Sequence, residues 1–145
     1  MNDNASPPPQ GHYVPAKRHG DMVFVSGMTP RKNGKLLHAG QVVWDTPVET
    51  YRHAVELATE NALQAAAAQL AIGERIVSVL NLTVYVNAPT GYTCHSQIAD
   101  FASHCIESHA VEGGVPSRTA IGVSSLPGGA VVEVALIAVA GPAQR

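Results

Sequence analysis

The sequence predicts an α+β sandwich, in which two helices pack on one face of a mixed β-sheet in the order β-β-β-α-β-α-β-β. Residues 46–73 and 93–110 carry apolar side chains at three- and four-residue spacing, typical of helices that bury one side. Residues 76–86 alternate between apolar and polar, and residues 119–126 and 130–140 flank a Pro-Gly-Gly turn, as strands do. The length of 145 residues is that of one domain.

The N-terminal part of the chain is predicted to form three short strands. Residues 13–16 and 22–26 are apolar stretches joined around His19-Gly20-Asp21. Asn33-Gly34 is flanked by charged residues and is a typical tight turn. A third strand is therefore predicted at residues 35–37.

The first helix has a predicted start and end. Thr46-Pro47-Val48-Glu49 has the form of a capping box, with Thr46 as N-cap, Pro47 in the first helical position and Glu49 reaching back. Gly73 is predicted to end the helix. Between these ends, one face of the helix carries an apolar stripe made of Tyr51, Val55, Ala58, Ala62 and Ala66.

The second half contains a strand, a helix and a predicted terminal hairpin. The strand at residues 76–86 places Ile76, Leu80, Leu82, Val84 and Val86 on one face, with Asn81 and Thr83 on the other. The helix at residues 93–110 buries Ile98, Phe101, Ala102, Cys105 and Ile106. Gly113-Gly114 is then predicted to end the helix. Pro127-Gly128-Gly129 is predicted to form the turn of the hairpin.

Composition limits the kind of protein and its partners. Only 14% of residues are charged, and nine Lys and Arg stand against eleven Asp and Glu, which disfavours binding to a nucleic-acid backbone. The low charge and the sheet face left uncovered by helices predict an oligomer. The N-terminus lacks the features of a signal peptide, and the apolar run at residues 130–140 is too short to span a bilayer. A cytoplasmic location is expected.

One domain is predicted, at residues 11–141. A flexible proline-rich arm is expected at residues 1–10, which include Pro7, Pro8 and Pro9. Residues 142–145 are expected to form a short tail.

Two charged residues are candidates for chemistry. Glu133 interrupts an apolar strand, where an unpaired carboxylate is costly to bury; the alternative is that it points to solvent. Arg118 enters a strand after a proline-fixed turn and offers a planar fork suited to a carboxylate; the alternative is a surface arginine. The predicted hairpin would place Glu133 opposite Gly122, about 13 Å along the strand from Arg118. A joint site therefore needs room for a ligand, or a group from a neighbouring subunit.

Other patterns are weaker. Ser26-Gly27 ends a strand and permits close approach of a ligand to the backbone, although a plain strand-ending glycine has the same form. Histidine and cysteine gather at Cys94, His95, His104, Cys105 and His109. These residues lack the spacing of a metal site, so we expect a core-facing Cys105, peripheral histidines, and neither a metal nor a disulfide. The nucleotide-binding and nucleophile-elbow motifs are absent from the sequence, and no cofactor is expected.

Four motifs together resemble the RidA (YjgF-like) family, also called L-PSP endoribonuclease-like. Gly11-His12-Tyr13 resembles its Gly-Pro-Tyr start, and Ser26-Gly27-Met28-Thr29-Pro30 its Ser-Gly-Gln-x-Pro. Pro116-Ser117-Arg118-Thr119 resembles its Pro-Ala-Arg-[Ser/Thr]. Leu126-Pro127 followed by Val132-Glu133-Val134 resembles its Leu-Pro…[Val/Ile]-Glu-[Val/Ile]. The resemblance covers nearly the whole chain after Gln10.

The resemblance implies a chorismate-mutase-like fold that forms a homotrimer, with sites in the clefts between subunits. It also implies hydrolysis of enamines and imines, such as 2-aminoacrylate and 2-iminopropionate, to a 2-keto acid and ammonia without a cofactor. Carried onto this chain, Arg118 would clamp the substrate carboxylate and Glu133 would orient or deprotonate the attacking water. The other implied substrate contacts are Tyr13, which would close the cleft, and the backbone around Ser26, Gly27 and Ala120.

The chain departs from the family pattern at several positions. Met28 replaces the usual Gln, Ala120 replaces a common Cys, the second helix lacks an expected asparagine, and residues 111–114 resemble a small insertion. These changes predict a more apolar pocket of different shape. Two other functions stay open: a trimer that binds small carboxylates or a protein without catalysis, and an RNA-cleaving translation inhibitor. The acidic pI of about 6.4 disfavours the RNA-cleaving function.

Overall fold

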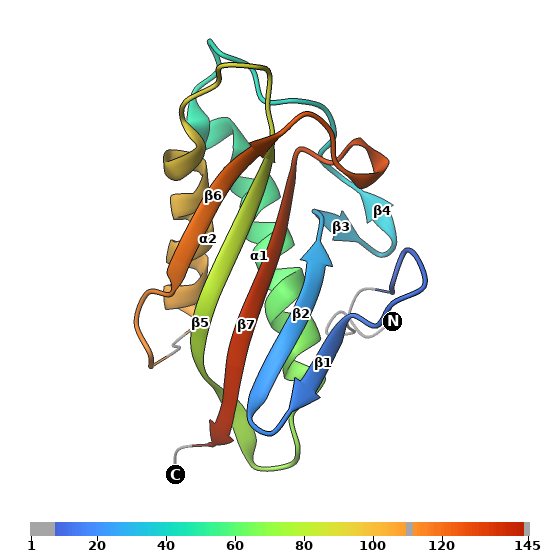
Figure 1. The fold of residues 1–145 in the computed structure, drawn as a ribbon, viewed down its shortest axis with the longest axis vertical. Helices are drawn as coiled ribbons and strands as arrows, with labels where there is room; N and C mark the ends of the chain where they lie inside the picture. The colour runs from blue at the N-terminus through green and yellow to red at the C-terminus, as the bar shows by residue number, and fades with distance from the viewer. Residues whose placement is uncertain (1–7, 110–111, 144–145) are drawn as a thin grey trace.

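The computed structural model describes residues 8–109 and 112–143. Two helices cover one face of a five-stranded sheet, and a two-stranded ribbon lies beside it (Figure 1). The strands are β1 (Ala16–His19), β2 (Met22–Met28), β3 (Arg31–Lys32), β4 (Lys35–Leu36), β5 (Glu74–Asn87), β6 (Ser117–Val123) and β7 (Val132–Pro142). The helices are α1 (Arg52–Ala67) and α2 (His95–Ser108), with 3₁₀ turns η1 (Val48–Tyr51) and η2 (Pro127–Gly129). The α+β prediction is confirmed. Residues 1–7 of the predicted arm, 110–111 and 144–145 lie outside the described part.

The strand order is β1-β2-β7-β5-β6, and the predicted terminal hairpin is wrong. β6 pairs with β5 in parallel, whereas β7 lies between β2 and β5 and is antiparallel to both. The physical reason is that every second residue of β7 is buried and those between are half-buried, which suits a central strand. β6 has exposed alternate positions and lies at the edge. In η2, Gly128 (φ 67°) and Gly129 (φ 78°) lie in the connection that reverses the chain and carries it past β5, so β6 and β7 are antiparallel but not neighbours.

The first helix differs from its prediction at both ends. The capping box is wrong: a 3₁₀ turn begins after Pro47, without a side-chain cap, and α1 starts at Arg52. α1 ends at Ala67, before the predicted stop, and Gly73 (φ 85°) instead turns the chain into β5. The predicted stripe is still the buried face, with Val55, Ala58, Ala62 and Ala66 fully covered.

The strands also differ in detail. β1 begins at Ala16, where the predicted first strand ends. The Asn33-Gly34 turn is present, with φ of 54° and 78°, and joins β3 to β4. In β5 the pairing register shifts twice between Ile76 and Asn81. Leu80 is therefore 45% exposed instead of facing the core, and Val79 takes the buried position.

The second helix follows its prediction closely. α2 runs from His95 to Ser108 and buries all five predicted core residues, Ile98, Phe101, Ala102, Cys105 and Ile106. The predicted last residue, Ala110, lies outside the described part. No helix in the described part of the chain combines the length and apolarity needed to cross a membrane.

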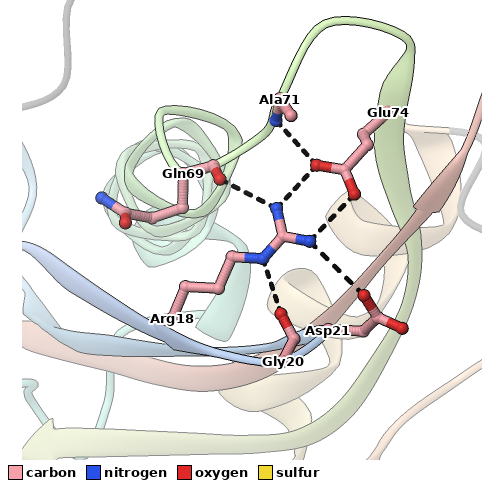
Figure 2. Close-up of polar contacts among 6 residues, drawn as sticks. All are labelled: Arg18, Gly20, Asp21, Gln69, Ala71 and Glu74. Carbon is pink, nitrogen blue, oxygen red and sulfur yellow. Dashed lines mark hydrogen bonds and ion pairs between the residues drawn. The ribbon is translucent and has the colours of Figure 1, made fainter.

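A polar network fastens one end of the sheet to the loop between α1 and β5 (Figure 2). Arg18 on β1 donates to both oxygens of Glu74, with Nη1–Oε1 2.6 Å and Nη2–Oε2 2.9 Å. Its other acceptors are the carbonyls of Gln69 and Gly20 and the carboxylate of Asp21. The Arg18 hydrogen bonds, with one from the Ala71 amide, lower the pKa of Glu74 to about 2.

Within residues 8–109 and 112–143, no element covers the sheet face opposite the helices. Because alternate residues of a strand point to opposite faces, the burial of Val132, Val134, Leu136 and Ala138 places the residues between them on the open face. Those residues are Glu133, Ala135, Ile137 and Val139. Neighbouring β2 adds Met22 and Phe24, which are 38% and 46% exposed. The β2 and β7 rows of the open face are therefore largely apolar, with Glu133 at one end of the β7 row, whereas β5 adds the polar side chains of Asn81 and Thr83.

Candidate functional site

Glu133 lies on the open sheet face, beside an irregular part of β2. The register of β2 on β7 shifts between Val25 and Met28, which brings Gly27 against the Glu133 side chain. A Cβ atom placed on Gly27 would be 2.7 Å from Oε1 and 2.8 Å from Cδ of Glu133. The absence of a side chain at Gly27 therefore makes room for this carboxyl group.

The Glu133 carboxyl is half-buried and has an unusual electrostatic environment. Among the residues that the structure describes, none forms a hydrogen bond or ion pair with it. Burial disfavours the charged form and raises the pKa of Glu133 above its usual range. The carboxyl can therefore hold or release a proton closer to neutral pH than an exposed glutamate does.

A pocket of about 480 Å³ opens beside Glu133. Four of the predicted site residues line it: Tyr13, Ser26, Gly27 and Glu133. The other lining residues are Gln10, Thr29, Arg31 and Pro127, which the sequence prediction missed. The volume is within the range of small-molecule sites in proteins.

Ser26 connects β2 to the segment that carries Tyr13. Its Oγ donates a hydrogen bond of 2.6 Å to the Val14 carbonyl, and its amide donates to the Pro15 carbonyl. The Tyr13 hydroxyl accepts a hydrogen bond from the Gln10 amide. Ser26 therefore holds the pocket wall in place and has its own hydroxyl proton engaged.

Arg118 and Ala120 lie elsewhere. In β6, Arg118 pairs with Leu82 and Ala120 with Val84, both core residues of β5, so their side chains face the helices. Glu133 pairs with Tyr85 on the opposite face. The expected arrangement of Glu133 facing Gly122 across a hairpin is wrong, because β5 separates the two strands.

The Arg118 guanidinium is held by α2. Nη1 donates to Asp100 Oδ1 at 2.8 Å and Ser103 Oγ at 3.0 Å, and Nη2 donates to the hydroxyl and carbonyl of Ser96. Its side chain is 19% exposed, and that of Asp100 is 52% exposed. Arg118 and Glu133 therefore point away from opposite faces of the sheet, and one subunit does not bring them together.

Of the histidines and cysteines in and beside α2, Cys105 and His109 contact each other, with Sγ 4.0 Å from Nδ1. No group of three or more potential metal ligands occurs within residues 8–109 and 112–143. Burial raises the pKa of Cys105 to about 12, so this residue is a neutral thiol in the core. His95 packs edge-on against Tyr92 and covers Gly122, where an added Cβ would be 2.5 Å from Nε2.

Comparison with known proteins places the chain in a family. A model of the family described as endoribonuclease L-PSP matches residues 3–140. The chain belongs to the endoribonuclease L-PSP family. This confirms the family that the Ser-Gly, Pro-Ser-Arg-Thr and Val-Glu-Val motifs predicted.

Individual relatives agree with this L-PSP membership. Protein TCP17 of Trypanosoma cruzi is 33% identical over 134 residues, which cover 90% of this chain and 82% of TCP17. The crystal structure of Atu1372, a protein of unknown function from Agrobacterium tumefaciens, has a TM-score of 0.80 and 30% identity, covering 89% of this chain and 83% of that chain. The YjgF gene product of E. coli has the same fold, with a TM-score of 0.62, 20% identity and 94% of each chain covered.

Proposed function

We propose that this L-PSP protein is a deaminase that hydrolyses imine and enamine derivatives of 2-keto acids in clefts between copies of the chain. The observation that carries the proposal is Glu133: a half-buried carboxyl of raised pKa, without a protein partner among the described residues, on the wall of a pocket of about 480 Å³. A carboxyl in this state suits general acid–base chemistry near neutral pH.

The proposed reaction needs little else from the protein. Glu133 accepts a proton from water as the water oxygen attacks the carbon of the C=N bond, and it returns this proton to the nitrogen to give a carbinolamine. The hydroxyl proton of the carbinolamine then passes through the same carboxylate to the nitrogen. Cleavage of the C–N bond then releases ammonia and leaves the 2-keto acid. Positioning water and imine against one carboxyl supplies most of the acceleration.

The second group of the proposed site comes from a neighbouring subunit. The Glu133 pocket borders the apolar β2 and β7 rows of the open face, which include exposed Phe24 and half-buried Ile137. A second copy packed on this face would adjoin the pocket. Arg118 is on the edge strand β6, where three α2 side chains already orient its guanidinium, and it can enter a neighbour's pocket as a carboxylate clamp. We propose a ring of three copies, each joining its Arg118 to the next subunit's Glu133.

The test is an amino-acid oxidase reaction that generates the imine, with semicarbazide to trap what remains. The wild-type protein is expected to deplete the imine, Glu133→Gln to lower kcat/KM by about 10²-fold and Arg118→Ala by about 10- to 100-fold. Arg75→Ala is the matched control, because Arg75 also pairs with one carboxylate, Glu112 at 2.7 Å, but lies outside the pocket. Thermal unfolding checks that each variant folds.

The same preparation separates the other functions. Lack of acceleration with imines from several amino acids, together with carboxylate binding that needs Arg118, would establish a binding module instead. The family name makes RNA cleavage the other outcome to examine, although a net charge of −2 gives the chain little attraction for phosphates. RNA cleavage that is lost in Glu133→Gln would replace the deaminase proposal.

A further inference from the structure

Arg31 is a cation on the wall of the Glu133 pocket that neither the motifs nor the proposed mechanism uses. It lies in β3 and is half-buried. Among residues 8–109 and 112–143, no carboxylate is within ion-pair distance of its guanidinium, whereas Arg18, Arg75 and Arg118 each have an acidic partner. A half-buried guanidinium without a counter-charge is costly unless a ligand compensates it.

The hydrogen bonds of Arg31 leave part of its donor set unused. Nη1 donates to the Gly34 carbonyl at 3.2 Å, but Nε is buried and lacks an acceptor among the described residues. Nη2 lies against Gly128, where an added Cβ would be 3.0 Å away. The guanidinium therefore sits between the β3–β4 turn and the η2 turn, at the end of the pocket that Pro127 also lines.

Hydrogen bonds from α1 hold the backbone at Arg31 in place. The buried Asn61 of α1 donates through Nδ2 to the carbonyls of Arg31 at 2.8 Å and Thr29 at 3.1 Å. These bonds fix the backbone on both sides of Pro30. A preorganised arginine loses less conformational entropy when it binds an anion, and its planar fork matches a carboxylate.

Arg31 and Glu133 share a pocket without pairing, so space for a ligand separates them. Burial, rather than a nearby cation, dominates the environment of the Glu133 carboxyl. The volume of about 480 Å³ holds a five-carbon acid easily. A ligand whose reacting carbon lies at Glu133 can extend its other end to Arg31.

We propose that Arg31 binds a second carboxylate of the substrate, which makes the substrate the imine of a dicarboxylic amino acid. This inference rests on the proposed imine hydrolysis and deepens it. Arg118 of the neighbouring copy takes the carboxylate next to the reacting carbon, and Arg31 takes the distal one. The pocket then carries two cations for two carboxylates.

The experiment compares two imines with the full-length protein. Alanine-derived 2-iminopropionate has one carboxylate, and glutamate-derived 2-iminoglutarate has two. Arg31→Ala is expected to lower kcat/KM for 2-iminoglutarate by roughly tenfold or more and to change that for 2-iminopropionate by less than about threefold. Arg31→Lys keeps the charge and recovers part of the loss. Lys32→Ala, which removes a neighbouring exposed charge outside the pocket, leaves both values unchanged.

A binding measurement keeps the two proposals separate. Calorimetry with the products should show 2-oxoglutarate binding more tightly than pyruvate to the wild type, with the preference lost in Arg31→Ala. An equal loss for both imines, or equal binding of both products by the wild type, overturns the role of Arg31. If the wild type hydrolyses neither imine but still prefers 2-oxoglutarate through Arg31, the deaminase proposal fails and the anion site stands.

Discussion

Gly27→Ala is expected to displace the Glu133 carboxyl without changing the local backbone. Gly27 has no positive φ, so alanine fits the main chain. The new Cβ would be 2.7 Å from Oε1, about 0.7 Å closer than the 3.4 Å at which ordinary contact begins. The carboxyl must therefore move by at least that distance. A misplacement of about 1 Å costs on the order of 10²-fold in rate, and crowding of this kind costs about 1–3 kcal/mol of stability.

The measurement is kcat/KM for imine hydrolysis together with urea unfolding. Gly141→Ala is the matched control, because its added Cβ would be 2.9 Å from Val77 Cγ1, at the end of β7 distant from Glu133. We expect both variants to lose similar stability and only Gly27→Ala to lose activity. Wild-type kcat/KM in Gly27→Ala would refute the argument that the position of this carboxyl matters, and an equal loss in Gly141→Ala would show a general effect of crowding.

The remaining predictions concern pH and assembly. Burial raises the folded-state pKa of Glu133, so the contribution of this residue to stability is complete below about pH 4 and is lost as pH rises through the folded-state pKa. Glu133→Gln should therefore remove this loss of stability with rising pH in unfolding curves. An unchanged pH slope in Glu133→Gln would contradict the prediction. The pKa of Glu74 is lowered to about 2, so Glu74→Gln should have a lower Tm than the wild type at pH 7, and this difference in Tm should disappear as pH falls from about 4 towards 2. A difference in Tm that does not depend on pH would mean that the Arg18–Glu74 pair is not its source. Light scattering should give three times the 15.1 kDa chain mass for the wild type and the mass of one chain for Phe24→Glu. Ile72→Glu, which changes a fully exposed loop position, should keep the mass of three chains. A wild type of 15.1 kDa would exclude the proposed cleft between subunits.

Local sequence patterns predicted the helices and strands of this fold better than they predicted which strands pair in the sheet. The spacing of apolar residues in α2 predicted its buried face except for Ala99, since that face depends only on helical geometry. The Pro127-Gly128-Gly129 turn was misinterpreted because strand pairing is a non-local choice. Its neighbour β7 is apolar on both faces apart from Glu133, the pattern of a central strand, and this signal was available in the sequence.

The candidate site was predictable only in part for the same reason. Glu133 stood out as the one charge in an apolar strand, and Gly27 as a strand glycine. The separation of Arg118 from Glu133 follows from the pairing of Arg118 with Leu82, which the wrong hairpin concealed. Arg31 was missed because its place in the pocket depends on packing against the η2 turn, nearly a hundred residues away. Its position just after Met28-Thr29-Pro30 was the available clue.

The orientation of Arg118 and Glu133 on opposite faces has a genetic consequence. In the proposed ring, every site takes Glu133 from one copy and Arg118 from another, so two inactive alleles can complement each other. When subunits carrying Arg118→Ala mix at random and in equal number with subunits carrying Glu133→Gln, about one site in four receives both intact side chains. A strain with both alleles should therefore regain activity that neither allele provides alone, while two alleles damaged in the same residue should not.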